Sequence, residues 1–300
     1  MDKKLFGLAL ILSGLVIGVV SEWPDRRLRV IACDVGQGDA IVLIQGFTQV
    51  LVDGGPNSRV VSCLSENMAF WDRTIEVMVA THPDKDHITG LADVIDSYKV
   101  ISFVSINKAN TSNEFKDLKN KILENKIPTH IAKIGDSIIA GKIKLNVLWP
   151  EKSDNKILVW AEKGDDLGDN QTLGLSANNR GDDSTNDYSV VLKACFGEFD
   201  VLLTGDIGKD IEKRLVDEFD LSGIEVLKVA HHGSKYSTSK ELLEELRPKV
   251  ALIGVGKNSW GHPTEEVLIN LREVDAEILR TDTMGEVGVV SDGKKFWIFD

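Results

Sequence analysis

Cysteine is scarce in this 300-residue sequence, which contains only Cys33, Cys63 and Cys195. The three are widely spaced, their number is odd, and no CxxC pair is present. Apolar residues flank each of them. We therefore expect three buried thiols, and neither a disulfide framework nor a cysteine-based zinc site.

Basic side chains are outnumbered, with 35 Lys and Arg against 47 Asp and Glu and a net charge of −12. Nonspecific binding of nucleic acid depends on Lys and Arg that neutralise phosphates, so this surface repels nucleic acid in general. A phosphate-bearing substrate would have to be attracted locally, for instance by bound cations. The main basic candidates near the motifs described below are Lys85, Arg180 and Lys235.

The sequence has a single long apolar run, from Leu5 to Val20, with Lys3 and Lys4 before it. This pattern makes residues 1–24 a signal peptide or a short N-terminal membrane anchor, and no clear cleavage motif decides between them. A buried first helix is the weaker alternative, because the run is apolar on all sides. We expect a protein that is secreted or anchored on the outer face of the cytoplasmic membrane.

Residues 27–300 have the composition of a folded domain, since the chain is 42% hydrophobic. Each half opens with hairpin strands and then alternates strand and helix. Two sheets packed face to face, with helices outside, would bury these elements, which predicts an α/β fold. Residues 161–186 form a polar insertion, which is either a substrate-covering flap or a plain surface loop.

The segment THPDKDHITG, residues 81–90, places four potential metal ligands behind an apolar strand. The alternative is a solvated turn followed by a helix N-cap. Five of the six histidines lie at or just beyond the end of an expected strand, whereas His130 does not. Those five are His82, His87, His231, His232 and His262. Because ligands gather at the carboxyl ends of strands in layered α/β folds, this distribution favours a metal site.

The spacing within this segment suits two metal ions. Side chains two apart on an extended segment point the same way, so His82 and Asp84 can face one ion. Asp86 and His87, where the helix begins, can face a second ion, and Asp206 in LLTGD can bridge the two. The carboxylate at position 84 shifts the preference towards manganese or another hard ion without excluding zinc.

Seven motifs together resemble the metallo-β-lactamase fold, and within it the hydrolase domain of the ComEC/Rec2 competence proteins. They are DVGQGDA, LVDGG, THPDKDHITG, NDYSVVL, LLTGD, LKVAHHGSKYSTS and WGHPTEEVL, in this order. The resemblance covers nearly the whole chain after the leader and implies a four-layer αββα sandwich. In THPDKDHITG, Thr89 stands where that subfamily has a glycine.

The resemblance also implies a set of functional residues. The implied ligands of two divalent ions, zinc or manganese, are His82, Asp84, Asp86, His87, Asp206, His231 and His262. The implied catalytic residues are Asp86, Asp206, His232 and Asn186. His231 or His232 completes a coordination shell or steadies a phosphate, and the sequence does not separate these roles. Asn186 falls near the place where the wider fold carries a histidine, so one ion would have a protein ligand fewer.

Three residues are candidates for supporting roles outside the ligand set. Asp53 either orients a ligand histidine or makes a local turn before Gly54. Ser189 and Ser234 either donate to a phosphate or act as ordinary turn and strand hydroxyls. We expect Asp39 and Gln37 only to cap a turn.

The first functional hypothesis is a metal-dependent phosphodiesterase, a nuclease acting on DNA outside the cytoplasm. The alternatives are hydrolysis of a lactam, thioester or other ester on the same fold, and a non-catalytic envelope binding protein. A serine nucleophile is disfavoured because no G-x-S-x-G motif accompanies Ser234. The implied partners are a phosphodiester substrate, the membrane DNA-uptake machinery, and the membrane itself if the leader is retained. No later run is long enough to span a membrane, so this chain is not expected to be the uptake channel.

Overall fold

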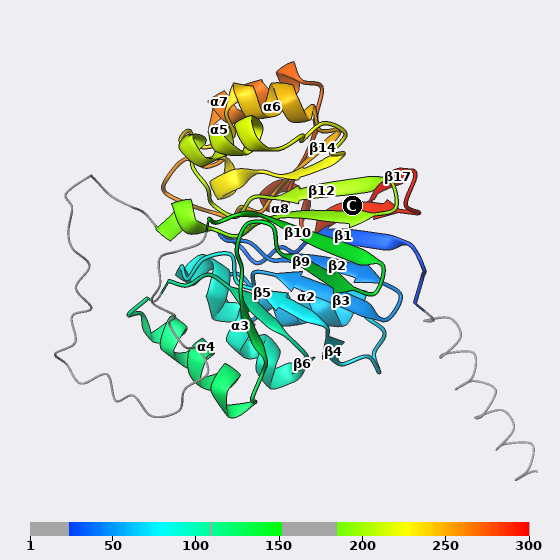
Figure 1. Cartoon of the computed structure of the whole chain (residues 1–300), viewed down its shortest axis with the longest axis vertical. Helices are drawn as coiled ribbons and strands as arrows, with labels where there is room; N and C mark the ends of the chain where they lie inside the picture. Colours follow the sequence, from blue (N-terminus) through cyan, green and yellow to red (C-terminus); the bar gives the residue numbers. More distant parts are fainter. Residues whose placement is uncertain (1–23, 109, 152–184, 300) are drawn as a thin grey trace, which may run out of the picture.

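Two β-sheets lie face to face, and helices cover the outer face of each sheet (Figure 1). The computed structural model describes residues 24–108, 110–151 and 185–299. The expected four-layer αββα sandwich is therefore confirmed. Residues 1–23 of the expected leader and residues 161–184 of the polar insertion lie outside the described residues. Within the described ranges, no helix has the length and hydropathy needed to cross a membrane.

The first sheet combines both ends of the folded chain. Its order is β17-β16-β1-β2-β3-β5-β7-β8, antiparallel from β17 to β3 and parallel from β3 to β8. The strands are β1 (Leu28–Ala32), β2 (Ile41–Gln45), β3 (Thr48–Val52), β5 (Val77–Val79), β7 (Phe103–Ser105), β8 (Thr129–Ile131), β16 (Val287–Ser291) and β17 (Phe296–Phe299). Two expected strands are each divided, and the short leading parts, β4 (Thr74–Ile75) and β6 (Lys99–Val100), pair with each other.

The second sheet has the order β15-β14-β13-β12-β11-β10-β9 and is parallel from β12 to β15. Its strands are β9 (Ser137–Ala140), β10 (Ile143–Trp149), β11 (Val191–Phe196), β12 (Phe199–Leu203), β13 (Val226–Lys228), β14 (Val250–Ile253) and β15 (Glu277–Arg280). Because β12, β13 and β14 run parallel, the loops that follow them meet at one edge of the sheet.

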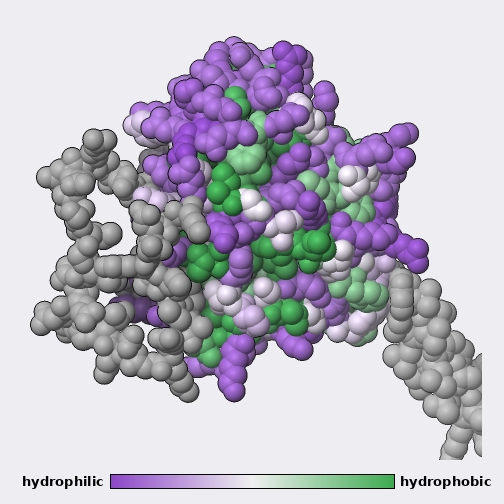
Figure 2. Space-filling model, viewed as in Figure 1, coloured by the Kyte–Doolittle hydropathy of each residue, from purple (hydrophilic) through white to green (hydrophobic). Residues whose placement is uncertain are grey.

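Helices cover the two outer faces with their apolar sides. On the first sheet these are α2 (Arg59–Asn67), α3 (Lys85–Ser97) and α4 (Asn113–Glu124); on the second they are α5 (Lys209–Glu218), α6 (Lys240–Leu246) and α7 (Glu265–Glu273). The solvent side of α5, α6 and α7 carries polar side chains, at the top of Figure 2. Short pieces complete the chain: η1 (Thr185–Tyr188), η2 (Ala230–Gly233) and α8 (Thr281–Met284).

Strand alternation divides the apolar residues into three cores. On β1, Val30 packs in the core between the sheets, whereas its neighbour Ile31 packs beneath the helices of the first sheet. Successive side chains on a strand point to opposite faces, so a strand buried on both faces is apolar throughout. Each fully buried aliphatic side chain contributes about 1.5–3 kcal/mol. These cores hold the strand ends rigidly, and the functional loops extend from them.

Cys33 and Cys63 form a disulfide, so the expectation of three free thiols was wrong for this pair. Cys33 directly follows β1, and Cys63 lies on the face of α2 that packs in the core of the first sheet. Thirty residues separate them, and their Cα atoms lie 5.9 Å apart. No local motif encodes this pairing, because it depends on how α2 packs across the end of β1. Cys195 is a free thiol, as expected, but it is only partly buried.

Replacing Cys63 with Ser is expected to lower the free energy of unfolding by about 2–4 kcal/mol, because the bond restricts the unfolded chain. Urea unfolding monitored by circular dichroism measures the change. Cys195→Ser is the matched control, since Cys195 is a free thiol. If Cys63→Ser and Cys195→Ser unfold at the same urea concentration, the disulfide does not contribute to stability.

Candidate metal centre

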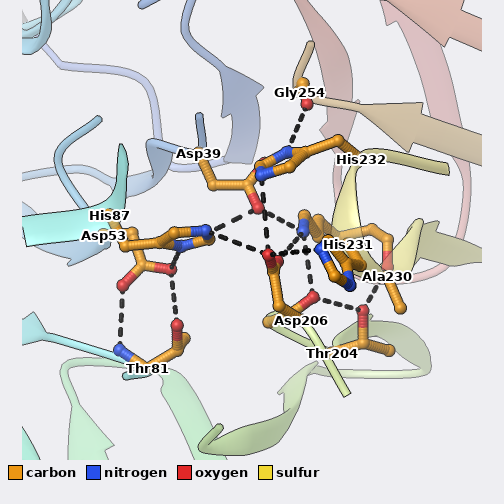
Figure 3. A network of polar contacts seen from close by, with 12 residues as sticks. Asp39, Asp53, Thr81, His87, Thr204, Asp206, Ala230, His231, His232 and Gly254 are labelled. Atoms are coloured by element: carbon orange, nitrogen blue, oxygen red, sulfur yellow. Dashed lines mark hydrogen bonds and ion pairs between the residues drawn. The ribbon is translucent and has the colours of Figure 1, made fainter. Parts of the chain in front are cut away.

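The functional loops meet at the carboxyl ends of the central strands of both sheets (Figure 3). The segment His82 to His87 follows β5 and enters α3. Asp206 follows β12, and His231 and His232 follow β13. Segments that are far apart in the sequence therefore supply one cluster of side chains.

Four buried side chains form the centre of this cluster. They are Asp39, His87, Asp206 and His232, and one ligand atom of each lies within 4.8 Å of the others. Asp206 Oδ2 lies 3.4 Å from His87 Nε2 and 3.6 Å from His232 Nε2. His232 Nε2 also lies 3.4 Å from Asp86 Oδ2. Two carboxylates and two imidazoles at this spacing can hold a divalent cation.

Three buried histidines present a free ring nitrogen to this cluster. The Nε2 atoms of His82, His87 and His232 have no hydrogen-bond partner among the described residues, and the same holds for Asp206 Oδ1. In each ring the other nitrogen is held: His82 Nδ1 contacts Thr81 Oγ1 at 3.0 Å, and His232 Nδ1 donates to the Gly254 carbonyl at 2.7 Å. A ring fixed through one nitrogen presents the other as a ligand. The residues present therefore fit a bound metal.

Asp53 holds the third histidine in place. Its Oδ2 lies 2.8 Å from His87 Nδ1, and its two oxygens accept the backbone N–H and hydroxyl of Thr81, each at 2.8 Å. Of the two interpretations of Asp53, the geometry matches the one in which it orients a histidine. Asp53 adopts a left-handed φ of 61°, which costs a non-glycine residue about 1–3 kcal/mol. The surrounding contacts impose this conformation.

Asp39 and Lys228 form a buried ion pair in the cluster, and the expectation that Asp39 only caps a turn was wrong. Lys228 Nζ contacts the Asp39 carboxylate, lies 3.6 Å from Asp206 Oδ1 and donates to the Gly205 carbonyl at 3.1 Å. Gln37, the other expected turn cap, accepts from the Gly256 backbone N–H at 3.2 Å. The sequence did contain a signal for Lys228, since a lysine inside a strand buried on both faces needs a partner.

Neighbouring charges set the protonation of the cluster. Burial disfavours the charged form of each group, but the carboxylates beside His87, Asp206 first, outweigh burial and raise its pKa. Asp39 and Asp206 likewise outweigh burial at His232 and raise its pKa to about 10. At His82 burial dominates, and together with the charge on His87 it lowers the pKa to about 4. The metal-free site therefore holds protons on His87 and His232 that a bound cation displaces.

The metal-free protein is expected to lose stability as the pH rises from about 7 to about 10. A histidine whose pKa is raised by folding contributes its full stabilisation at a pH below its pKa in the unfolded chain, ~6.5. That contribution is lost as the pH rises towards and past the pKa in the folded protein, which is about 10 for His232. Urea midpoints of chelated protein across this range measure the effect. Metal-loaded protein is the control, because its ligand histidines are already deprotonated. A urea midpoint that rises with pH after chelation would show that these histidines do not have raised pKa values in the folded protein.

The structure distinguishes the two neighbouring histidines. His232 is buried, whereas the His231 side chain is 30% exposed and its Nε2 lies 4.0 Å from Asp206 Oδ2. Both adopt left-handed backbone conformations, with φ of 51° and 54°. Two consecutive strained residues of this kind are characteristic of functional sites. A Cβ at Gly233 would lie 2.5 Å from Pro263 Cβ, so glycine is needed where this loop meets the loop carrying His262.

The other ligand candidates lie around this centre. Asp84 Oδ2 is 3.8 Å from His82 Nε2, and the rings of His231 and His262 have centroids 5.6 Å apart. Asp84 does occupy the N-cap position of α3, but its carboxylate accepts from the Thr185 hydroxyl at 2.9 Å and makes no capping bond within the described residues. This geometry does not match the interpretation of THPDKDHITG as an ordinary N-cap.

The remaining candidates have supporting positions. Asn186 Nδ2 lies 3.5 Å from His231 Nδ1. The buried hydroxyl of Ser189 accepts the Asp206 backbone N–H at 3.2 Å, so it fixes the loop of the central carboxylate. Ser234 Oγ accepts from the Tyr236 N–H at 3.3 Å, which is a turn contact. His130 lies on β8 and contacts Asp136.

Replacing His232 with Asn is expected to lower metal affinity at least about 100-fold, because a buried and oriented ligand atom is lost. His231→Asn, the matched control in the next residue, is expected to retain metal, since His231 lies at the rim. Metal content after dialysis and competition with a chromophoric chelator measure both variants. Equal losses in the two variants would mean that both histidines bind the ion.

The fold and the cluster at its strand ends define the class of protein. Among solved structures, the chain resembles YhfI from Bacillus subtilis, a metallo-β-lactamase fold protein, with a TM-score of 0.53 and 12% identity, covering 91% of this chain and 100% of that one. It also resembles CmlA, a diiron β-hydroxylase from Streptomyces venezuelae, with a TM-score of 0.51 and 12% identity, covering 88% and 54%. This protein has the metallo-β-lactamase fold. No protein-family model matches the chain.

Sequence similarity to known proteins identifies a narrower group within this fold. The chain is 31% identical over 218 residues to ComE operon protein 3 of Bacillus subtilis, covering 72% of this chain and 24% of that protein. It is 26% identical over 285 residues to Recombination protein 2 of Haemophilus influenzae, covering 93% and 31%. Competence protein ComA of Neisseria gonorrhoeae is 25% identical over 279 residues, covering 92% and 34%. The chain is homologous over most of its length to the ComEC/Rec2/ComA competence proteins, and it spans about a quarter to a third of their length.

Proposed function

We propose that this protein hydrolyses phosphodiester bonds of DNA outside the cytoplasm, using two divalent ions, zinc or manganese. The observation that carries the proposal is the set of buried Nε2 and carboxylate atoms without hydrogen-bond partners at the meeting point of the strand ends. Buried polar atoms without a hydrogen-bond partner are rare in folded proteins, and a bound cation would satisfy several of these atoms at once. The cluster is therefore built for a metal-dependent hydrolase.

The residues would divide between two ions on either side of Asp206. His82 and Asp84 would hold one ion, and Asp86, His87 and His232 the other, with Asp206 between them. When bound, the ions would supply an activated water and neutralise charge on the phosphate oxygens. Asp53 and the Gly254 carbonyl fix the rings that bind. His231, at the rim, is placed to donate a hydrogen bond to a phosphate oxygen.

The donor set favours a phosphate ester over a lactam. Asp84, Asp86 and Asp206 make the site rich in carboxylate oxygen, which suits hard ions such as manganese and the oxygens of a phosphate. Asp84 also stands where lactamases keep a histidine. The homology to proteins named for competence and recombination supports DNA as the substrate.

The disulfide supports a site of action outside the cytoplasm. Disulfides persist in oxidising compartments and are rare in the cytosol, so the Cys33–Cys63 bond agrees with a secreted or membrane-anchored protein. We propose that residues 1–24 direct the chain there, as a signal peptide or as an anchor. The membrane DNA-uptake machinery is then the expected partner.

The proposal is tested with purified protein, chelated and then reloaded with zinc or manganese. The substrates are single- and double-stranded DNA, bis-p-nitrophenyl phosphate, a thioester and nitrocefin. Metal-dependent cleavage of the phosphodiesters is expected, and Asp86→Ala is the inactive control. Cleavage of nitrocefin or the thioester alone would assign a different bond, and no metal uptake at all would favour a non-catalytic binding protein.

A further inference from the structure

An exposed indole lies at the rim of the metal centre. Trp260 is 67% exposed, and its ring stacks on His262 with centroids 6.3 Å apart and planes 30° apart. The His262 ring is 5.6 Å from that of His231, whose Nε2 lies 4.0 Å from Asp206 Oδ2. A line of aromatic rings therefore leads from solvent to the central carboxylate.

The loop that carries Trp260 is rigidly built around Asn258. Asn258 Oδ1 accepts the backbone N–H groups of Trp260 and His262 at 3.1 and 3.0 Å, and Nδ2 donates to the carbonyls of Gly256 and His262 at 2.9 and 2.8 Å. Gly256 N–H in turn donates to Gln37 Oε1. These bonds fix the backbone while the indole remains in solvent. Such preorganisation lowers the entropy cost of binding a flat ligand.

A second exposed aromatic side chain projects from the neighbouring loop. Tyr236 is 67% exposed and follows the two histidines of η2 in the same loop. Lys235 Nζ lies 5.0 Å from the Tyr236 ring centroid, which places one of the few basic side chains near the motifs beside this ring. The two loops pack together where the Thr264 backbone N–H donates to the Gly233 carbonyl at 2.9 Å.

We propose that Trp260 and Tyr236 form a stacking subsite for unpaired nucleobases of a single-stranded nucleic acid whose backbone crosses the metal centre. This inference rests on the proposed function, which supplies the phosphodiester. The centroid distances of 6.3 Å from Trp260 to His262 and 5.6 Å from His262 to His231 keep the indole close to a phosphate that would bind at His231. At ~3.4 Å per nucleotide, the separation is at most about three to four nucleotides.

The charge of the protein explains why stacking is needed. A protein with a net charge of −12 and few basic side chains near the motifs gains little affinity from phosphate contacts along a strand. Stacking on aromatic rings supplies affinity that does not depend on charge, and it tolerates any sequence because every base has a flat face. In a duplex the bases are already stacked on one another, so this subsite selects single strands.

The test removes the indole and the base separately and together. Binding of a fluorescent oligodeoxythymidylate with cleavage-resistant phosphorothioate linkages is compared with that of its abasic counterpart by anisotropy. Trp260→Ala is expected to weaken binding of the intact strand about fivefold to a hundredfold and to change binding of the abasic strand little. Trp297→Ala is the matched control, since Trp297 is 47% exposed on β17, away from the centre.

Two further variants and one further ligand complete the experiment. Trp260→Phe keeps a flat ring and is expected to restore most of the affinity, which separates stacking from a folding defect. Tyr236→Ala is expected to show the same dependence on the base. An oligoribonucleotide of the same length shows whether the subsite prefers DNA or RNA.

The inference is overturned if Trp260→Ala weakens both strands equally or neither strand. A failure of the proposed function has a different signature, namely no cleavage of any phosphodiester with zinc or manganese. The binding measurement does not depend on cleavage, so the two failures are distinguishable.

Discussion

Asp206→Asn is expected to reduce metal-dependent phosphodiester hydrolysis by on the order of a thousandfold, because the charge at the centre of the cluster is lost while its shape is kept. The Asp206 carboxylate lies within 3.4 to 4.0 Å of three imidazole Nε2 atoms. Despite burial, the charges on His87 and His232 hold its pKa well below the ordinary value, so it is ionised at neutral pH. Steady-state kcat/KM on bis-p-nitrophenyl phosphate measures the loss of activity. Metal content after dialysis shows whether the variant has also lost a metal ion.

Asp200→Asn is the matched control, because Asp200 lies on β12, the strand that leads to Asp206. Its carboxylate pairs with Lys193 at 2.8 Å near the surface. Its activity is expected to stay within a few-fold of the wild type, since its carboxylate pairs with Lys193 and not with a residue of the metal centre. Full metal content and near-normal kcat/KM in Asp206→Asn would show that the reaction centre lies elsewhere.

The fold was predictable because its signals are local. Apolar runs of strand length alternate with helical spacing, and parallel strands bring their carboxyl ends to one edge. Within the second sheet, that rule brings Asp206, which follows β12, close to His231 and His232, which follow β13. The segment His82 to His87 follows β5 of the first sheet and reaches Asp206 only because the two sheets pack together. The helix starting at Lys85 and the strands around Val30 and Val226 follow the expected pattern. Asp53 was predicted either to orient a ligand histidine or to make a local turn, and its Oδ2 lies 2.8 Å from His87 Nδ1.

What the sequence did not reveal depends on contacts across the sheets. Cys33 and Cys63 pair only because α2 crosses the end of β1. Asp39 lies in the loop before β2 of the first sheet and Lys228 ends β13 of the second, so the two meet only after the sheets pack. The separate roles of His231 and His232 depend on two left-handed backbone conformations, which composition and spacing do not specify.

Lys228→Met is expected to lower the free energy of unfolding of the metal-free protein by about 3–5 kcal/mol. Removing one partner of a buried ion pair leaves the other charge without compensation. Lys228 is 2% exposed, contacts the Asp39 carboxylate and lies 3.6 Å from Asp206 Oδ1. Methionine fills a similar volume, so the loss reports on charge and not on a cavity. Urea unfolding after chelation measures the change.

Lys193→Met is the matched control, because the side chains of Lys193 and Asp200 are 22% and 20% exposed, against 2% and 1% for Lys228 and Asp39. Its effect is expected to be smaller, about 1 kcal/mol. The double variant Asp39→Asn with Lys228→Met is expected to recover part of the loss, since it removes both charges of the pair. Reloading Lys228→Met with zinc or manganese should also reduce the deficit, because a bound cation supplies positive charge beside the same carboxylates. If the deficit is the same with and without metal, Lys228 and the ion act on different groups. A deficit that shrinks on loading means that the lysine and the metal compensate the same buried negative charge.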